Sequence, residues 1–180
     1  MKKQENNVAY IDGANLYKGI QELGWCLDYK RFRIWLKDKY SVERAYIFIG
    51  LVFKNKDLYT FLQEAGFTLV FKETICDGEG RIKGNCDADL VLKVVVDYYE
   101  KQFNKAIIVA SDGDYAGLVN FLKEKNVFQS LITPSNKCSF LLRKLNIPLV
   151  YLDTQRSKLS YNSHKEKAPN EDGTSSGSFS

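Results

Sequence analysis

Short apolar segments alternate with amphipathic segments along most of the chain, and this alternation constrains the fold more than any other feature of the sequence. Apolar runs of strand length occupy residues 8–12, 44–50, 67–71, 105–110, 127–133 and 148–152. Between them, apolar residues recur at helical spacing in segments 14–23, 29–39, 56–65, 90–103, 115–125 and 138–145. Strands that alternate with helices form a mostly parallel sheet covered on both faces. The pattern therefore predicts an α/β fold.

One folded domain is predicted from residue 7 to residue 155. The chain has 180 residues, a length that suits a single domain with a buried core. Within this domain, residues 77–85 are polar, contain glycine and are predicted to form a loop. From residue 156 onward the composition shifts towards serine, asparagine, lysine, glutamate and glycine. Such a segment has little apolar surface to bury, so residues 156–180 are predicted to be a disordered polar tail.

The distribution of histidine and cysteine excludes several classes of hydrolase. The only histidine, His164, lies in the predicted tail, which argues against a Ser-His-Asp triad, a histidine-based ribonuclease and a histidine-containing zinc site. The four cysteines show no C-x-x-C spacing, and the sequence has neither a secretory signal nor an apolar run long enough to cross a membrane. We therefore expect a cytoplasmic protein with free thiols and no membrane partner.

The net charge of +4 is concentrated in one part of the sequence. Between Lys30 and Arg44 there are six basic residues and two acidic ones. Such a segment either attracts a polyanion or forms a solvated helix face. The aromatic residues of the same region are predicted to pack in the core or along the helix, not to stack on nucleobases: Tyr29, Phe32, Trp35 and Tyr40.

Two predicted strands end in an Asp-Gly step. Asp12-Gly13 follows the first strand, and Asp112-Gly113-Asp114 follows the strand at 105–110. Each step is also ordinary turn and helix-capping chemistry, and Ser111-x-x-Asp114 resembles a capping box. Right-handed crossovers place the carboxyl ends of parallel strands along one edge, where open sheets of this kind bind ligands. The two Asp-Gly steps are therefore predicted to meet at that edge.

A third acidic site precedes the predicted helix at 90–103. Asp87 falls in line with apolar residues that point towards the sheet. Asp89 falls on a polar stripe that continues through Lys93 and Asp97, and this stripe is predicted to face solvent and to pair Asp89 with Lys93. A carboxylate directed at the interior is costly unless it is paired or bound to metal. Asp87 is therefore either satisfied by backbone N–H groups or part of a carboxylate cluster that a hard cation such as Mg²⁺ or Mn²⁺ neutralises.

Three segments resemble the NYN domain, a branch of the PIN-like nucleases, in order and in spacing: Tyr10-Ile-Asp-Gly-Ala-Asn-Leu-Tyr17, Lys83-Gly-Asn-Cys-Asp-Ala-Asp-Leu90 and Val109-Ala-Ser-Asp-Gly-Asp-Tyr115. The resemblance covers about residues 7–152. It implies a PIN-like three-layer α/β/α sandwich with a mostly parallel central sheet, and hydrolysis of RNA that depends on Mg²⁺ or Mn²⁺. It also implies five catalytic residues, of which the first three hold the metal: Asp12, Asp87, Asp112, Asp114 and Asn15.

Several points remain open at the level of sequence. Arg81 and Lys83 precede Asp87 and either grip the RNA backbone or are solvated loop residues. Ala110-Ser111 stands before Asp112 where the family often has Ser-Gly. The alternative functions are an RNA-binding regulatory adaptor with weak or no catalysis and a structure-specific DNA nuclease. The oligomeric state, a homodimer included, is also open.

Overall fold

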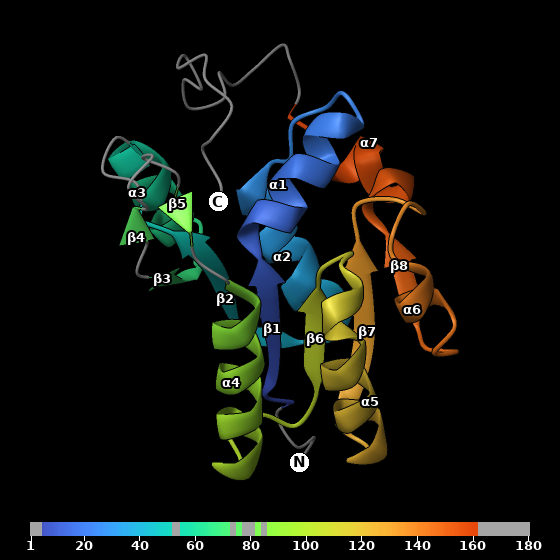
Figure 1. Cartoon of the computed structure of the whole chain (residues 1–180). Coiled ribbons are helices and arrows are strands. Elements are labelled where there is room, and N and C mark those ends of the chain that lie inside the picture. The colour runs from blue at the N-terminus through green and yellow to red at the C-terminus, as the bar shows by residue number, and fades with distance from the viewer. Residues whose placement is uncertain (1–4, 52–54, 73–74, 77–81, 84–85, 162–180) are drawn as a thin grey trace.

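The computed structural model describes residues 5–51, 55–72, 75–76, 82–83 and 86–161 of the chain (Figure 1). Six parallel strands form its central sheet in the order β3-β2-β1-β6-β7-β8. They are β1 (Asn7–Asp12), β2 (Val42–Gly50), β3 (Thr68–Lys72), β6 (Ala106–Val109), β7 (Phe128–Thr133) and β8 (Leu149–Tyr151). A separate antiparallel pair joins β4 (Ile75–Cys76) to β5 (Ile82–Lys83). The predicted α/β fold is confirmed, and its central sheet is parallel throughout.

Helices cover both faces of this sheet, because side chains along each strand point alternately to opposite faces. In β1, Ala9 and Ile11 pack on one face, and Val8 and Tyr10 pack on the other. The first face is covered by α1 (Gly13–Glu22), α2 (Tyr29–Tyr40), α3 (Lys56–Glu64) and α7 (Arg156–Leu159). The second face is covered by α4 (Cys86–Tyr99), α5 (Ala116–Glu124) and α6 (Phe140–Arg143). The molecule is thus a three-layer α/β/α sandwich.

The direction of the strand order reverses between β1 and β6. From β1 the chain continues to β2 and β3 on one side, whereas β6, β7 and β8 extend the sheet on the other side. The carboxyl ends of β1 and β6 point to the same edge, the upper edge in Figure 1. In open parallel sheets, ligands bind outside the carboxyl ends of the strands at such a reversal. Asp12 and Asp112 follow these two strands, so the topology places both beside this reversal.

The boundaries of two helices differ from the prediction. Helix α4 begins at Cys86 rather than at residue 90, and two carboxylates in its first turn suit the positive end of a helix. Helix α6 is confined to Phe140–Arg143, and the Ser139 hydroxyl caps it by accepting a hydrogen bond from Leu141 N. The predicted loop at 77–85 contains strand β5, and the rest of that segment lies outside the described residues. None of the helices within the described ranges combines the length and apolarity needed to cross a membrane.

The sequence predicts that the polar stripe of α4 faces solvent, but in the structure only part of this stripe does so. Asp89 is exposed, but Asp97 is 1% exposed. Lys93 Nζ donates to Asp97 at 2.6 Å, so its ion pair is with Asp97 and not with Asp89 among the described residues. The Tyr10 hydroxyl donates to the other Asp97 oxygen at 2.8 Å. The buried carboxylate is stable here because a cation and a phenol, supplied by two different elements, both contact it.

The folded part of the chain continues beyond the predicted boundary at residue 155. Residues 156–161 include helix α7, and Leu159 is 1% exposed in the core that α1 and α2 share with the sheet. Asp28 N donates to Leu159 O at 2.8 Å, and Leu27 forms an antiparallel bridge with Ser160. The prediction was wrong for these six residues, because one leucine among polar neighbours suffices to anchor a short helix. Residues 162–180 lie outside the described residues.

Candidate active site

Asp12 is held in one orientation at the start of α1. It is the last residue of β1 and the N-cap of α1, where its Oδ1 accepts a hydrogen bond from Asn15 N at 3.0 Å. Gly13 follows because α1 begins against β2: a Cβ at this position would lie 2.9 Å from Phe48 O. The capping role considered for Asp12 is therefore real. It uses only one carboxylate oxygen, and Oδ2 accepts a second hydrogen bond, from the Tyr115 hydroxyl at 3.0 Å.

Tyr115 joins Asp12 to Asp87. The Tyr115 hydroxyl lies 2.6 Å from Asp87 Oδ1 and 3.0 Å from Asp12 Oδ2. A phenol has one proton, so it donates fully to only one of the two carboxylates at a time. The contact with Asp87 is the shorter one. When the phenol donates its proton to Asp87, Asp12 Oδ2 has no other donor among the described residues. Asp12 lies 103 residues before Tyr115 in the sequence, and it is only 5% exposed. The geometry therefore leaves a buried acceptor that a proton or a cation would satisfy.

Asp112 and Asp114 lie on the exposed side of the same region. Asp112 is the N-cap of the 3-10 helix η2 (Gly113–Tyr115), and its Oδ1 accepts from Asp114 N at 3.1 Å. Both carboxylates are exposed. The expected capping box from Ser111 to Asp114 is not what the structure has, because Asp112 occupies the cap position and the Ser111 hydroxyl is engaged elsewhere.

Asn15 connects the ends of the two central strands. Its Oδ1 accepts hydrogen bonds from Ser111 N at 2.8 Å and from the Ser111 hydroxyl. The segment that carries Asp112 is thereby tied to the first turn of α1, next to Asp12. Ser111 therefore has a specific contact in this chain. Asn15 thus links the turn that carries Asp12 to the turn that carries Asp112 and fixes their relative position.

Burial and neighbouring charge both disfavour ionisation of Asp12. Desolvation is the largest cause and raises the pKa of its carboxyl group above the usual value. Hydrogen bonds from Asn15 N and the Tyr115 hydroxyl act in the opposite direction, and the negative charges of Asp87 and Asp112 raise the pKa further. Burial and the two aspartates also raise the pKa of the Tyr115 phenol well above its usual range, so the phenol keeps its proton. Asp87 and Asp112 thus both act electrostatically on Asp12.

The described residues do not by themselves form a finished metal centre. Asp12 and Asp87 meet at Tyr115, whereas Asp112 is exposed. Within the described ranges, no three acidic, cysteine or histidine side chains are close enough to hold a metal ion as they stand. Arg81 lies outside the described residues, and for Lys83 only the strand position in β5 is described. Tyr115 is the residue that the sequence analysis missed, and its one sequence signal is its position directly after Asp114.

The basic and aromatic residues between positions 29 and 44 serve packing to a large extent. Phe32 and Tyr40 are buried in the core, as predicted. The Arg33 guanidinium donates to three backbone carbonyl groups, those of Gly66, Val42 and Glu43.

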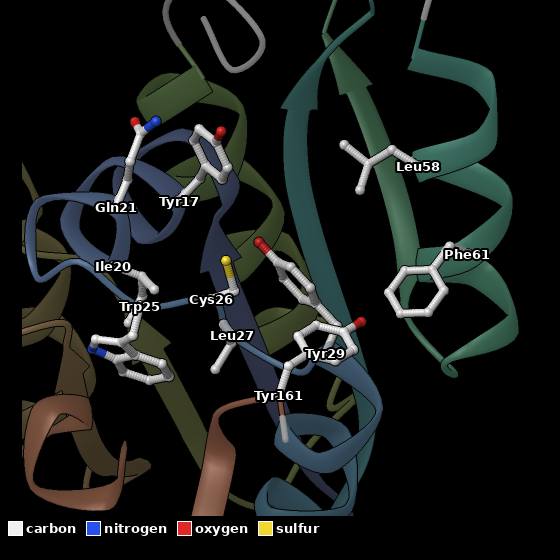
Figure 2. Close-up of a pocket in the computed structure, with 10 residues that line it drawn as sticks. All are labelled: Tyr17, Ile20, Gln21, Trp25, Cys26, Leu27, Tyr29, Leu58, Phe61 and Tyr161. Atoms are coloured by element: carbon white, nitrogen blue, oxygen red, sulfur yellow. The ribbon is translucent and has the colours of Figure 1, made fainter. Parts of the chain in front are cut away.

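An apolar pocket of about 70 Å³ lies nearby and includes Tyr29. Figure 2 shows the side chains that surround it: Tyr17, Ile20, Gln21, Trp25, Cys26, Leu27, Tyr29, Leu58, Phe61 and Tyr161. None of the five predicted catalytic residues, which we call the acidic-site residues, lines this pocket: Asp12, Asn15, Asp87, Asp112 and Asp114.

The chain is similar to known proteins in sequence and in fold. The model of the NYN domain family matches residues 7–144. The low amplitude and bright protein LabA of Synechococcus elongatus is 23% identical over 158 residues, which cover 82% of this chain and 84% of that protein. A crystal structure of a protein of unknown function from Vibrio parahaemolyticus has the same fold, with a TM-score of 0.74 and 19% identity over 89% of this chain and 99% of that chain. Because the family model spans most of the sequence and all five acidic-site residues, the chain belongs to the NYN domain family.

Proposed function

We propose that this protein is a metal-dependent ribonuclease in which Asp12, Asp87 and Asp112 hold Mg²⁺ or Mn²⁺. The observation that carries the proposal is the shared phenol: two carboxylates from different elements converge on the single proton of Tyr115. Buried or half-buried carboxylates repel each other unless a cation offsets their charge. Membership of the NYN domain family supports the same function, because this family is a branch of the PIN-like nucleases.

The donor set fits a hard divalent ion. Every candidate ligand is a carboxylate oxygen, and Mg²⁺ and Mn²⁺ prefer oxygen ligands, whereas the described residues offer no histidine. Asp12 is held by its cap, so its other oxygen, Oδ2, has a fixed position. Asp112 is exposed and close enough to raise the pKa of Asp12, so it would hold the ion from the solvent side. A bound ion would activate water for attack on phosphorus and offset charge on the leaving oxygen.

The surrounding residues have positioning roles in this proposal. Tyr115 holds Asp12 and Asp87 at a fixed separation, and Asn15 holds the turn that carries Asp112. The exposed carboxylate of Asp114 is free to orient a water molecule beside the phosphodiester. Arg81 and Lys83 precede α4 in the sequence and would contact the flanking RNA backbone.

A second function, an RNA-binding adaptor without cleavage, is favoured by one observation. Asp112 caps a 3-10 turn and is exposed, so the described residues leave the third carboxylate outside a closed ligand set. In an adaptor the three aspartates would keep their capping and hydrogen-bonding roles, and RNA would be bound but not cleaved, whether or not a divalent ion is present. The two functions thus differ in their response to metal.

Metal dependence is the direct test of the proposal. Purified protein is expected to cleave labelled single-stranded or hairpin RNA with Mn²⁺ or Mg²⁺, to lose this activity in EDTA, and to regain it when metal is added back in excess. The measurement is the initial rate of product formation on a denaturing gel. Undiminished cleavage in EDTA would contradict the carboxylate–metal mechanism. RNA binding without cleavage under all metal conditions would favour the adaptor.

A further inference from the structure

A polar groove lies directly beside the acidic residues. It has a volume of about 280 Å³ and runs between α1 and the loop that follows β7. Asn15 and Ser111 line it, and these two residues also form the crosslink next to Asp12 and Asp112. The remaining lining residues are Lys18, Gly19, Glu22, Pro134, Ser135, Lys137 and Cys138. The groove therefore begins at the acidic site and continues away from it along α1.

The walls of the groove are held in place. Four lining residues of α1, at positions 15, 18, 19 and 22, have the spacing of one helix face. At Gly19 this face touches the opposite wall, because a Cβ there would clash with the Pro134 ring. The opposite wall is fixed by backbone contacts: Asp153 N donates to Pro134 O at 3.0 Å, and Ser139 N donates to Ser111 O at 2.9 Å. The shape therefore exists without a ligand.

Two lysines give the groove a positive character. Lys18 and Lys137 are exposed, one on each wall, and within the described part of the chain neither ammonium group has an ion pair or hydrogen-bond partner. Glu22 supplies one opposing carboxylate. The acidic site next to the groove repels any phosphate that approaches it without a metal ion. Two cations beside that site would offset this repulsion and attract a polyanion across the edge of the sheet.

We propose that this groove binds a backbone phosphate of the RNA strand that flanks the bond cleaved at the acidic site, with Lys18 and Lys137 as its counter-charges. This proposal rests on the proposed function, because it takes RNA as the ligand. It adds how the RNA strand is held beside the acidic site. Backbone phosphates carry most of the affinity of proteins for nucleic acids, and lysine contacts to them do not depend on base sequence. The groove therefore supplies affinity and direction to the strand, not base specificity.

The test is RNA binding without cleavage, measured over a range of salt concentrations. The probe is a fluorescein-labelled single-stranded RNA of about twelve nucleotides, followed by fluorescence anisotropy in EDTA. The double variant Lys18→Ala/Lys137→Ala is expected to bind about ten- to hundredfold more weakly than the unmodified protein and to lose about 0.7 from the slope of log affinity against log salt, the value for one phosphate contact on a single strand. The matched control is Lys37→Ala/Lys125→Ala, which removes two exposed lysines from the ends of α2 and α5. It is expected to change neither quantity.

A change of opposite sign completes the test. Glu22→Gln removes the one carboxylate of the groove and is expected to strengthen RNA binding several-fold without affecting the melting temperature. If the unmodified protein binds RNA and the two lysine pairs weaken it equally, the groove proposal is overturned while the proposed function stands. If the unmodified protein binds no RNA in EDTA, the groove proposal fails, whereas the proposed function is judged separately by the dependence of cleavage on metal. Weaker binding by the groove variant with an unchanged salt slope would also overturn the phosphate contact.

Discussion

Replacing Asp87 by asparagine is expected to lower RNA cleavage by several orders of magnitude while the protein stays folded. The Asp87 oxygen accepts a hydrogen bond from the Tyr115 hydroxyl at 2.6 Å, and the asparagine oxygen can accept the same bond. The substitution therefore preserves the local contact and removes the negative charge that would hold a metal ion. The variant is expected to be as stable as the unmodified protein or more stable, because it relieves repulsion between Asp87 and Asp12 in the metal-free state.

Asp89 provides the matched control for this substitution. It lies two residues later in the same helical turn of α4, and its side chain is exposed. Asp89→Asn removes the same charge from the same helix terminus and is expected to leave the cleavage rate nearly unchanged. The measurements are initial rates with Mn²⁺ and thermal melting of both variants. An essential Asp89 together with a dispensable Asp87 would mean that the site is built from the other face of α4.

Removing residues 156–180 is expected to destabilise the protein substantially, in contrast to the expectation from composition. A chain that ends at Gln155 lacks Leu159, which is 1% exposed, and loss of a buried leucine side chain costs about 2–5 kcal/mol of unfolding free energy. It also lacks the carbonyl groups that accept hydrogen bonds from Asp28 N and Arg31. The free energy of unfolding, measured in urea, is expected to fall accordingly.

Two further chains make this prediction specific. A chain that ends at Tyr161 keeps all described contacts of α7 and is expected to unfold at the same urea concentration as the full-length protein. The single substitution Leu159→Ala in the full-length chain is expected to reproduce most of the loss seen on truncation at Gln155. Equal stability of the chains that end at Gln155 and Tyr161 would show that α7 contributes nothing to the fold.

The edge that carries the acidic residues was predictable from sequence because it follows from topology. Alternating strands and helices imply parallel strands, and right-handed connections place their carboxyl ends together. The residues after β1 and β6 must then lie at the same edge of the sheet, and the structure shows that these two strands are neighbours. The orientation of Asp87 towards this site also followed from helical spacing, since α4 has a clear apolar face.

The contacts of buried polar groups were not predictable in the same way. The phenol of Tyr115 meets Asp12 and Asp87 only because η2 and α4 approach each other above the sheet. Asp97 lies on a polar stripe in the sequence, yet the Tyr10 hydroxyl reaches it from β1, 87 positions away. Periodicity shows which residues share a helix face, but it does not show which group from another element will cover that face.

The central claim is most directly tested by manganese binding in the absence of RNA. Electron paramagnetic resonance measures free Mn²⁺ during titration of the unmodified protein and of Asp12→Asn, Asp87→Asn and Asp89→Asn. The unmodified protein and Asp89→Asn are expected to bind Mn²⁺ with equal affinity, whereas Asp12→Asn and Asp87→Asn are expected to bind at least about tenfold more weakly. Equal Mn²⁺ binding by all four proteins, or no binding by any of them, would contradict an aspartate-held metal site.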